Sequence, residues 1–341
     1  PAPRYGERRF AVEAIDVLRR TSELDGTAPA TIDLSPSVRG GNTLGANDGR
    51  GHARNPATGE PYAPNVVRRG DFARALTEFW ADGPESETPP GHWNTIANEV
   101  SDAPGFRHVL AGRAVDRLEW DVKLYFALNG AVHDAAVAAW GAKRYYDSAR
   151  PISMIRYLGG RGELPLVPGL VERVTRASSA PGGRHARLRE HVGRIAVRSW
   201  LANPRPDRPA GVGWLLATEW LPYQRPTFVT PAFAGYVSGH STFSRAAAEV
   251  LTSITGSEYF PGGMLEWPVK KGALANEPGP TRDLVLQWAT YYDAADDAGI
   301  SRLYGGIHIP ADDFAGRRLG ARCGKDAWAL ANRYFDGTAR A

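Results

Sequence analysis

Three short stretches of the sequence combine side chains that could hold a tetrahedral oxyanion. The first is Ser238-Gly239-His240, where an irregular Pro/Gly-rich segment runs into the Ala-rich residues 241–251. The first N–H groups of a helix lack partners and carry a partial positive charge, and glycine lets a ligand come close to the backbone. Ser238 could equally be a simple helix cap, so this motif alone leaves both interpretations open.

The other two stretches supply cations and a second imidazole. Lys143 and Arg150 lie seven residues apart at the end of a long predicted helix, which puts them on one face, two turns apart, before Pro151 stops or redirects the helix. Arg302 and His308 are joined by Leu-Tyr-Gly-Gly-Ile, whose glycines allow a tight turn that returns the imidazole toward the guanidinium. Each residue alone is more simply explained as part of a solvated face or of the core. Their joint occurrence in this order is hard to reach by accident.

Together these groups match the needs of one tetrahedral anion. A guanidinium fork pairs with two oxygens at once, and lysine adds a compact charge. With two histidines, one can bond to the central atom while the other moves a proton. The sequence therefore predicts an oxyanion site whose parts are distant in the chain.

The elements that must position these groups are mostly helices. Apolar periodicity predicts helices at residues 5–22, 71–80, 92–100, 114–146, 184–202, 241–251, 281–299 and 310–335. The apolar face of the longest helix is predicted to consist of Val115, Leu118, Val122, Tyr125, Ala127, Leu128, Val132, Ala136 and Trp140. No alternating strand pattern of useful length is found. The predicted fold class is mainly α, with helices packed as bundles.

Between these elements the sequence is rich in Gly, Pro, Asn and Asp. Residues 25–66 predict a long surface excursion that wraps around the body. Further irregular stretches are predicted at residues 158–183, 203–230 and 256–280. We predict an N-terminal helix and wrapping loop at residues 1–70 and a helical-bundle catalytic domain at residues 71–341, the two forming one compact unit.

Composition argues against several classes of function. The net charge is +4, but basic and acidic residues alternate along the chain, which argues against nucleic-acid binding. No apolar run approaches the ~20 residues needed to span a bilayer. The lone Cys323 excludes an internal disulfide and a cysteine metal site. Because the first residue is Pro1, we expect either a processed product or a fragment of a longer chain. Removal of an upstream targeting segment would be typical of a secreted or periplasmic protein.

The three motifs resemble those of the vanadium-dependent haloperoxidases and their relatives, the type 2 phosphatidic acid phosphatases and bacterial acid phosphatases. The resemblance covers about residues 70–325 and implies their helical-bundle fold and a bound vanadate, with phosphate able to occupy the same site. It implies that His308 bonds to vanadium and that His240 is the acid–base residue. The residues implied to hold the oxygens are Lys143, Arg150, Ser238, Gly239 and Arg302. One departure is Val237, at a position where the family usually has proline.

Flanking residues resemble those of the fungal-type chloroperoxidases. Trp140, Pro231 and Phe233 stand where apolar groups shape a halide pocket in that family, although core packing is an equally good explanation. The segment 79–83 is similar to a stretch whose aspartate pairs with the last arginine of the site and supports the catalytic histidine. Asp82 would take that role here, or would be a turn residue before a Gly-Pro pair.

The resemblance leaves two activities open at one site. As a haloperoxidase, the chain would use hydrogen peroxide to oxidise halide to hypohalous acid, which could pass to an organic acceptor. Vanadate would act as a Lewis acid, His240 would take up a proton from peroxide, and Lys143 would polarise the bound oxidant. As an acid phosphatase, His308 would form a phosphohistidine and His240 would protonate the leaving alcohol.

A third candidate function is that of a non-catalytic anion-binding protein. It is disfavoured because all the expected polar side chains are present. Members of the family often carry a second helical bundle upstream. We therefore expect a homo-oligomer or an upstream segment to complete the structure.

Overall fold

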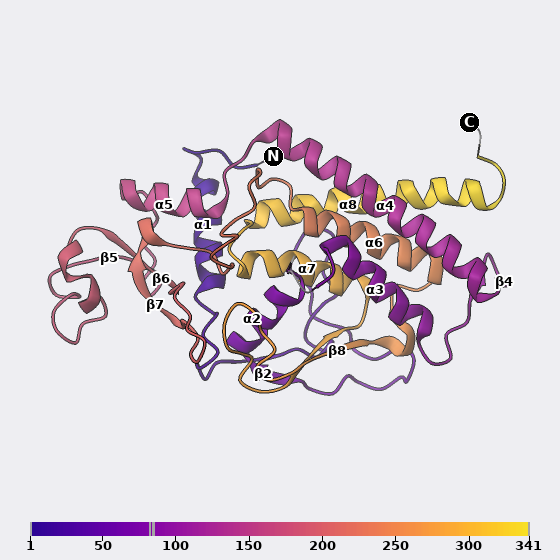
Figure 1. The fold of residues 1–341 in the computed structure, drawn as a ribbon, viewed down its shortest axis with the longest axis horizontal. Coiled ribbons are helices and arrows are strands. Elements are labelled where there is room, and N and C mark those ends of the chain that lie inside the picture. Colours follow the sequence, from indigo (N-terminus) through magenta and orange to yellow (C-terminus); the bar gives the residue numbers. More distant parts are fainter. Residues whose placement is uncertain (1, 82, 84–85, 340–341) are drawn as a thin grey trace.

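Helices dominate the fold, in a computed structural model that describes residues 2–81, 83 and 86–339 (Figure 1). The mainly α fold class is therefore confirmed. The helices are α1 (Arg8–Thr21), α2 (Arg69–Phe79), α3 (Pro89–Asp102), α4 (Arg117–Tyr146), α5 (Pro151–Arg161), α6 (Gly239–Thr255), α7 (Tyr291–Tyr304) and α8 (Pro310–Phe335). The strands are β1 (Thr31–Asp33), β2 (Val66–Arg68), β3 (Val109–Leu110), β4 (Arg113–Ala114), β5 (Val171–Arg173), β6 (Ile195–Trp200), β7 (Val212–Leu216), β8 (Leu265–Val269) and β9 (Leu284–Trp288). In this described part of the chain, no helix is long and apolar enough to cross a membrane.

Helix α6 lies at the centre of the bundle and packs against α3, α4, α7 and α8 (Figure 1). Nearly every side chain in its first three turns is buried, which explains its Ala-rich sequence, since a helix surrounded by partners needs small apolar side chains on all faces. Ser238 caps α6, because its hydroxyl oxygen accepts the N–H of Ser241 at 3.3 Å. The capping interpretation of this serine is therefore correct, and it does not exclude a second role.

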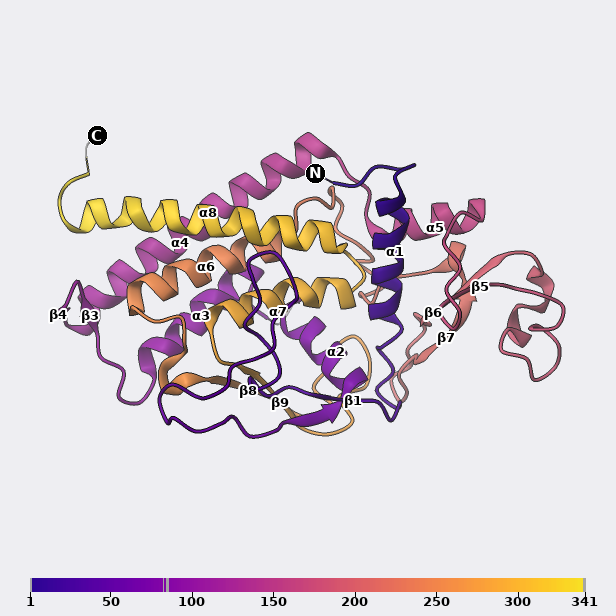
Figure 2. The same ribbon diagram turned by 180° about the vertical axis from the view of Figure 1, so that it is seen from behind.

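Four helix ends meet at one end of the bundle, where the C-terminal ends of α4 and α7 lie beside the N-terminal ends of α6 and α8 (Figures 1 and 2). Lys143, in the last turn of α4, donates to the carbonyl of Gly235 just before α6, at 2.8 Å. The N–H of Ser238 donates to the carbonyl of Asp312 in the first turn of α8, at 3.0 Å. The predicted site residues are thus brought together by the ends of separate helices.

Glycines let α8 approach α6 closely. Gly316, Gly320 and Gly324 follow one another at intervals of four and share one face of α8. A Cβ atom at any of the three would lie within 2.8 Å of a backbone oxygen of α6 or of its cap, Ser238. The two backbones are therefore in direct contact along this face.

We expect Gly320→Ala to lower the free energy of unfolding by about 1–3 kcal/mol, because the added methyl group, 2.2 Å from the carbonyl oxygen of Thr242, forces the two helices apart. Urea denaturation followed by circular dichroism measures this change. Gly130→Ala in α4 is the matched control, since a Cβ there meets no atom within 4 Å outside its own helix and should add about 0.5–1 kcal/mol of stability. Equal unfolding midpoints for the parent and Gly320→Ala would refute the close contact.

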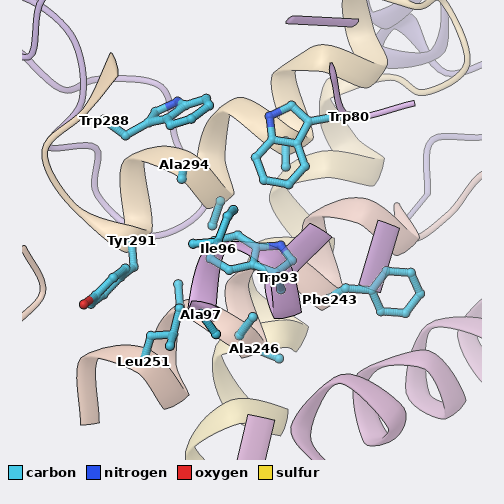
Figure 3. Close-up of a cluster of buried hydrophobic side chains, with 14 of the residues drawn as sticks. Trp80, Trp93, Ile96, Ala97, Phe243, Ala246, Leu251, Trp288, Tyr291 and Ala294 are labelled. Atoms are coloured by element: carbon cyan, nitrogen blue, oxygen red, sulfur yellow. The ribbon is translucent and has the colours of Figure 1, made fainter. Parts of the chain in front are cut away.

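The main hydrophobic core extends from α2 to α8, and Figure 3 shows the part of it that includes residues of α3, α6, α7 and β9. Trp80 and Trp93 stack there with ring centroids 5.8 Å apart. Trp93 donates its indole N–H to the hydroxyl of Ser244 in α6 over 2.8 Å, so its one polar atom is satisfied. This packing holds the backbone at Trp80 against the start of α6, where its carbonyl oxygen contacts a site histidine.

A small antiparallel sheet of the order β5-β6-β7 packs beside the bundle together with α1 and α5 (Figure 1). A second hydrophobic cluster joins these elements and includes Leu18, Ile155, Val197 and Trp220. It anchors α5, and with it Arg150 at the α5 N-terminus.

The N-terminal segment between α1 and α2 runs over the outside of α7 (Figure 2). Arg39 forms an ion pair with Asp297 of α7 at 2.7 Å, and Asn42 donates to Asp296 at 2.9 Å. These contacts attach the segment to the bundle, as the predicted wrapping requires. The predicted boundary between two domains stays a prediction.

Several predicted elements are wrong. The predicted helix at residues 184–202 is a 3-10 helix, Ala186–His191, followed by β6. The predicted helix at 281–299 begins only at Tyr291, after β9, and the strands were not recognised in the sequence. The first three residues of β6 are all buried, so its apolar residues do not alternate and periodicity could not reveal a strand.

The predicted apolar face of α4 is wrong in its first turns. Leu118 and Val122 are 74% and 60% exposed, whereas Trp120 and Leu124 are fully buried. Leu128, further along the same predicted face, is buried as expected. Helix α4 itself carries apolar residues on most of its sides. Its packing against α6 and α8 therefore decides which side is buried.

Lys143 and Arg150 do not share a helix, contrary to the prediction. Helix α4 ends at Tyr146, because Asp147 adopts a left-handed conformation with φ of 42°. Arg150 is the N-cap of α5, and Pro151 occupies the first position of that helix, where its missing N–H costs nothing. The proline therefore begins a helix rather than ending one, and a turn redirects the chain between the two cations.

Candidate active site

A pocket of about 990 Å³ opens where the four helix ends meet. The predicted site residues that line it are Trp140, Lys143, Arg150, Pro231, Phe233, Gly239, His240, Arg302 and His308. Ser238 lies directly before Gly239 at the α6 N-terminus. The prediction for Asp82 lies outside the described residues. The structure therefore brings the three predicted motifs to a single cavity, and their chemical roles stay predictions.

Lys143 reaches the pocket from the last turn of α4 and is 3% exposed. Its ammonium donates to the carbonyl oxygens of Ala234 and Gly235 at 3.0 and 2.8 Å. Burial, and then repulsion from the Arg150 guanidinium, lower the pKa of Lys143 to about 7. An anion beside it would favour the charged form and offset this loss.

Arg150 is held by three acceptors, and one of its nitrogen atoms has none. Its Nε donates to the Phe233 carbonyl at 2.9 Å, and its Nη1 donates to the Ile307 carbonyl at 2.7 Å and to His308 Nε2 at 3.0 Å. Its Nη2 is buried with no hydrogen-bond partner among the described residues. Burial lowers the pKa of Arg150 to about 10, so it remains charged at neutral pH. A buried donor without an acceptor is costly, and an oxyanion in the pocket would satisfy it.

His308 lies in the loop between α7 and α8, and both its ring nitrogens have partners. Nδ1 is 2.8 Å from the carboxylate of Asp312, and Nε2 is 3.0 Å from the donating Nη1 of Arg150. This pattern assigns the ring proton to Nδ1, and the lone pair of Nε2 accepts the Arg150 N–H. Burial and the neighbouring cations hold the pKa of His308 well below its usual value, so the ring is neutral and able to act as a ligand or nucleophile.

Asp312 belongs to the candidate site through its contact with His308, and it was not among the residues predicted from the sequence. It lies four residues after His308 in the first turn of α8, and its carboxylate also accepts the N–H of Ile309 at 3.3 Å. The missed signal was local, because a carboxylate at this spacing, just inside a helix that follows a histidine, can fold back onto the ring. Asp312 therefore holds the ring so that Nε2 meets Nη1 of Arg150.

His240, in the first turn of α6, is held in a similar way by the backbone. Its Nε2 is 2.7 Å from the carbonyl oxygen of Trp80, which can only accept, so Nε2 carries the proton. Burial, and then the charge of Arg302, hold the pKa of His240 well below its usual value. The neutral ring leaves Nδ1 as a proton acceptor.

Arg302, at the end of α7, completes the cationic groups. Its Nη2 donates to the Thr77 carbonyl at 2.6 Å, and its Nε donates to the Ser301 hydroxyl at 2.9 Å. The turn after α7 contains Gly306 in a left-handed conformation, φ 71°, and brings His308 back to the pocket that Arg302 also lines. The predicted glycine turn is therefore confirmed.

The predicted halide-pocket residues form an aromatic wall beside Lys143. The rings of Trp140 and Phe233 have centroids 5.1 Å apart, and the Lys143 ammonium lies 5.7 and 5.3 Å from their respective centroids. Pro231 lines the same pocket. Both residues line the pocket and are partly exposed, so they are not sealed in the core.

We expect the affinity of the site for phosphate to fall as the pH rises above about 7. Lys143 is charged below its pKa and neutral above it, so the ammonium is lost in that direction. Relative to Lys143→Arg, which stays charged, the affinity of the parent should fall by up to about tenfold per pH unit. Calorimetric titration with phosphate between about pH 6 and 9 measures both proteins, and their ratio cancels the ionisation of the anion. A ratio that does not change with pH would show that Lys143 keeps its charge throughout.

The family follows from a comparison with known domains. Residues 123–337 match the VCPO second helical-bundle domain, VCPO being vanadium-dependent chloroperoxidase. This match covers more than half of the chain. It includes the C-terminal ends of α4 and α7 and the N-terminal ends of α6 and α8, which meet at the pocket. The chain belongs to the family of the second helical-bundle domain of vanadium-dependent chloroperoxidases.

Solved structures with the same fold extend the comparison. An apo-type bacterial vanadium-dependent chloroperoxidase matches with a TM-score of 0.62 and 17% identity, over 99% of this chain and 53% of that one. A holo-type bacterial vanadium-dependent chloroperoxidase matches with a TM-score of 0.59 and 17% identity, over 98% and 51%. This chain spans about half the length of these chloroperoxidases, and the likeness at this identity shows the fold alone. No curated protein sequence matches the chain.

Proposed function

We propose that this protein is a vanadate-dependent haloperoxidase, which oxidises halide with hydrogen peroxide. The observation that carries the proposal is the buried, unpartnered Nη2 of Arg150 beside the Nε2 lone pair of His308 in one cationic pocket. A lone pair for the central atom next to an unsatisfied donor for its oxygens is the arrangement that a histidine-bound oxyanion needs. Membership of the chloroperoxidase domain family supports vanadate as that anion.

The residues of the pocket offer the donor set that vanadate needs, once Arg150 Nη1 gives up its hydrogen bond to His308 Nε2. His308 would bond vanadium through Nε2, with Asp312 holding the ring in place. The oxygens would be held by Lys143, Arg150, Arg302, Ser238 and the Gly239 amide. The N-terminus of α6 adds the partial positive charge of the helix dipole. When bound, vanadate supplies a Lewis acid that activates peroxide without a change in its own oxidation state.

His240 would act as the base for hydrogen peroxide. Its Nε2–H bond to the Trp80 carbonyl fixes the tautomer in which Nδ1 is free, and its lowered pKa keeps that nitrogen unprotonated at neutral pH. Lys143, beside the rings of Trp140 and Phe233, would attract the halide and draw electron density from the peroxide. The overall reaction consumes peroxide, halide and one proton and yields hypohalous acid and water.

An acid phosphatase of the same superfamily is the second candidate, and the His308–Asp312 pair favours it as well. A carboxylate at Nδ1 makes Nε2 a better nucleophile toward phosphorus, and it stabilises the positive charge that forms on the ring. His240 would then protonate the leaving alcohol. Vanadate would inhibit this reaction, because it resembles the transition state of phosphoryl transfer.

One assay pair separates these candidates. We expect bromide- and peroxide-dependent halogenation of monochlorodimedone to appear on addition of vanadate and to disappear when phosphate replaces it. Hydrolysis of 4-nitrophenyl phosphate that vanadate suppresses, without halogenation, would replace the first candidate by the second. If neither activity is seen although phosphate binds, the protein is an anion-binding protein and both proposals fail.

A further inference from the structure

The outer side of α4 carries an exposed strip that is partly apolar. Helix α4 lies on the outside of the bundle, since it crosses in front of α6 and α8 in Figure 1 and behind them in Figure 2. Val122, Phe126 and Val137 are 60%, 51% and 62% exposed. Positions three or four apart share one side of a helix. This side, called here the α4 strip, consists of Glu119, Val122, Phe126, Gly130, His133, Val137, Gly141 and Arg144.

Two glycines in the α4 strip have no packing role within the described chain. Gly130 and Gly141 lie inside a helix of 30 residues, where glycine is less favourable than alanine. A Cβ atom at either position would meet no atom within 4 Å outside its own helix. On α8, by contrast, Gly320 lets the backbone of α6 come close. A helix packed on the α4 strip from outside would gain the same close approach.

The strip is complementary to itself when a second α4 packs on it antiparallel, with a two-fold axis between Ala131 and Val132. Gly141 then faces Val122 of the second copy, and Gly130 faces its His133, so that a small residue meets a larger one. In the same register Phe126 faces Val137, so the two largest apolar side chains of the strip meet near the axis. Each contact occurs twice, as a two-fold interface requires.

Charges at the two ends of the strip favour the same register. Glu119 is in the first turn of α4 and Arg144 is in the last turn. In the antiparallel pair each Glu119 faces Arg144 of the second copy, whereas a parallel pair would bring like charges together. A surface shaped for an unrelated domain has no reason to match itself in both size and charge. The second copy is therefore the occupant that the strip fits best.

We propose that the α4 strip is an interface between two copies of this chain, packed antiparallel about a two-fold axis. The Lys143 end of α4 in one copy would lie beside the start of α4 in the other. The exposed valines and Phe126 would be removed from water, which is the usual reason for apolar side chains to gather on a surface. This inference does not depend on the activity proposed above.

Sedimentation equilibrium of the parent protein and two variants tests the interface. We expect a dimer at micromolar concentration, and Val137→Glu should weaken dimerisation at least tenfold because it places an unpaired carboxylate against Phe126 of the second copy. Val12→Glu is the matched control, since Val12 is 43% exposed on α1, and it should leave dimerisation within twofold. Circular dichroism checks that both variants are folded. A monomeric parent would overturn the proposal in favour of a different domain or chain on this face. A dimer of unchanged strength in Val137→Glu would place the interface elsewhere.

Cysteine cross-linking tests the register. Val122→Cys and Gly141→Cys are made in separate chains, each with Cys323→Ala to remove the native thiol. The two variants are mixed in dilute solution, concentrated and oxidised, and we expect a covalent dimer only in the mixture. Neither variant should link to itself, because like positions lie about 28 Å apart along the antiparallel helices, and a disulfide spans only about 4–7 Å between Cα atoms. Self-linking of either variant, or no linking in a mixture that forms dimers, would refute this arrangement.

Discussion

His308→Ala is expected to abolish vanadate binding at concentrations that saturate the parent protein. The substitution removes Nε2, the nitrogen proposed to bond the central atom, which is also the acceptor of Arg150 Nη1. It also leaves the carboxylate of Asp312 buried without the imidazole, so the remaining charges no longer define one anion site. Calorimetric titration with orthovanadate measures the loss, with circular dichroism to show that the protein is folded.

Asp312→Asn is expected to weaken vanadate binding less than His308→Ala does. The amide keeps the size of the side chain but no longer stabilises the Nδ1 proton as a carboxylate does, so a loss of about 10–100-fold in affinity is expected. His133→Ala is the matched control, because His133 lies on α4 with a side chain that is 75% exposed and it does not line the pocket. Saturable vanadate binding by His308→Ala with the affinity of the parent would exclude His308 as the ligand.

His240→Ala is expected to separate binding from turnover. His240 lines the pocket and is hydrogen-bonded to the Trp80 carbonyl, while Lys143 and Arg150 are held by other backbone carbonyls. The variant should therefore bind vanadate within several-fold of the parent. Its kcat should fall by about 10²–10⁴-fold, the usual contribution of a positioned general base.

The pH profile gives this second prediction a further check. Because the pKa of His240 lies well below its usual value, the parent should keep its base in the active, neutral form from neutral pH down into the acidic range. In His240→Ala the residual activity should rise with pH, as solvent hydroxide replaces the missing base. A variant that turns over at the parent rate, or that loses vanadate binding and turnover together, would assign the proton transfer to another group.

The helices that carry the site were largely predictable from the sequence, and the reason is local. Ser238 and Gly239 mark the start of α6, and the apolar periodicity of residues 5–22 and 310–335 matches α1 and α8 closely. Caps and helical periods act over a few residues, so they can be recognised without knowledge of the fold. The same holds for the turn at Gly306, which the pattern between Arg302 and His308 predicts.

Predictions failed where the local apolar pattern fits more than one structure. Ile195, Ala196 and Val197 are buried between neighbours in β6, and such a run gives the same apolar pattern as a buried helix. Leu118 and Val122 are as apolar as Leu124, yet only Leu124 faces the core, because the position of α6 and α8 decides the buried side of α4. These choices depend on partners that are distant in the sequence.

The sequence by itself determined which chemical groups the protein possesses, namely the two histidines, the three cations and the serine-capped helix start, because residue type and local spacing carry that information. Only the tertiary structure decided how those groups behave. Arg150 reaches the site through the turn at Asp147 and the start of α5, not along α4. Asp312 and the Trp80 carbonyl set the tautomers of His308 and His240, and burial moves the pKa of Lys143 to about 7. Desolvation and hydrogen-bond direction arise from packing between distant segments, so they exist only once the chain has folded.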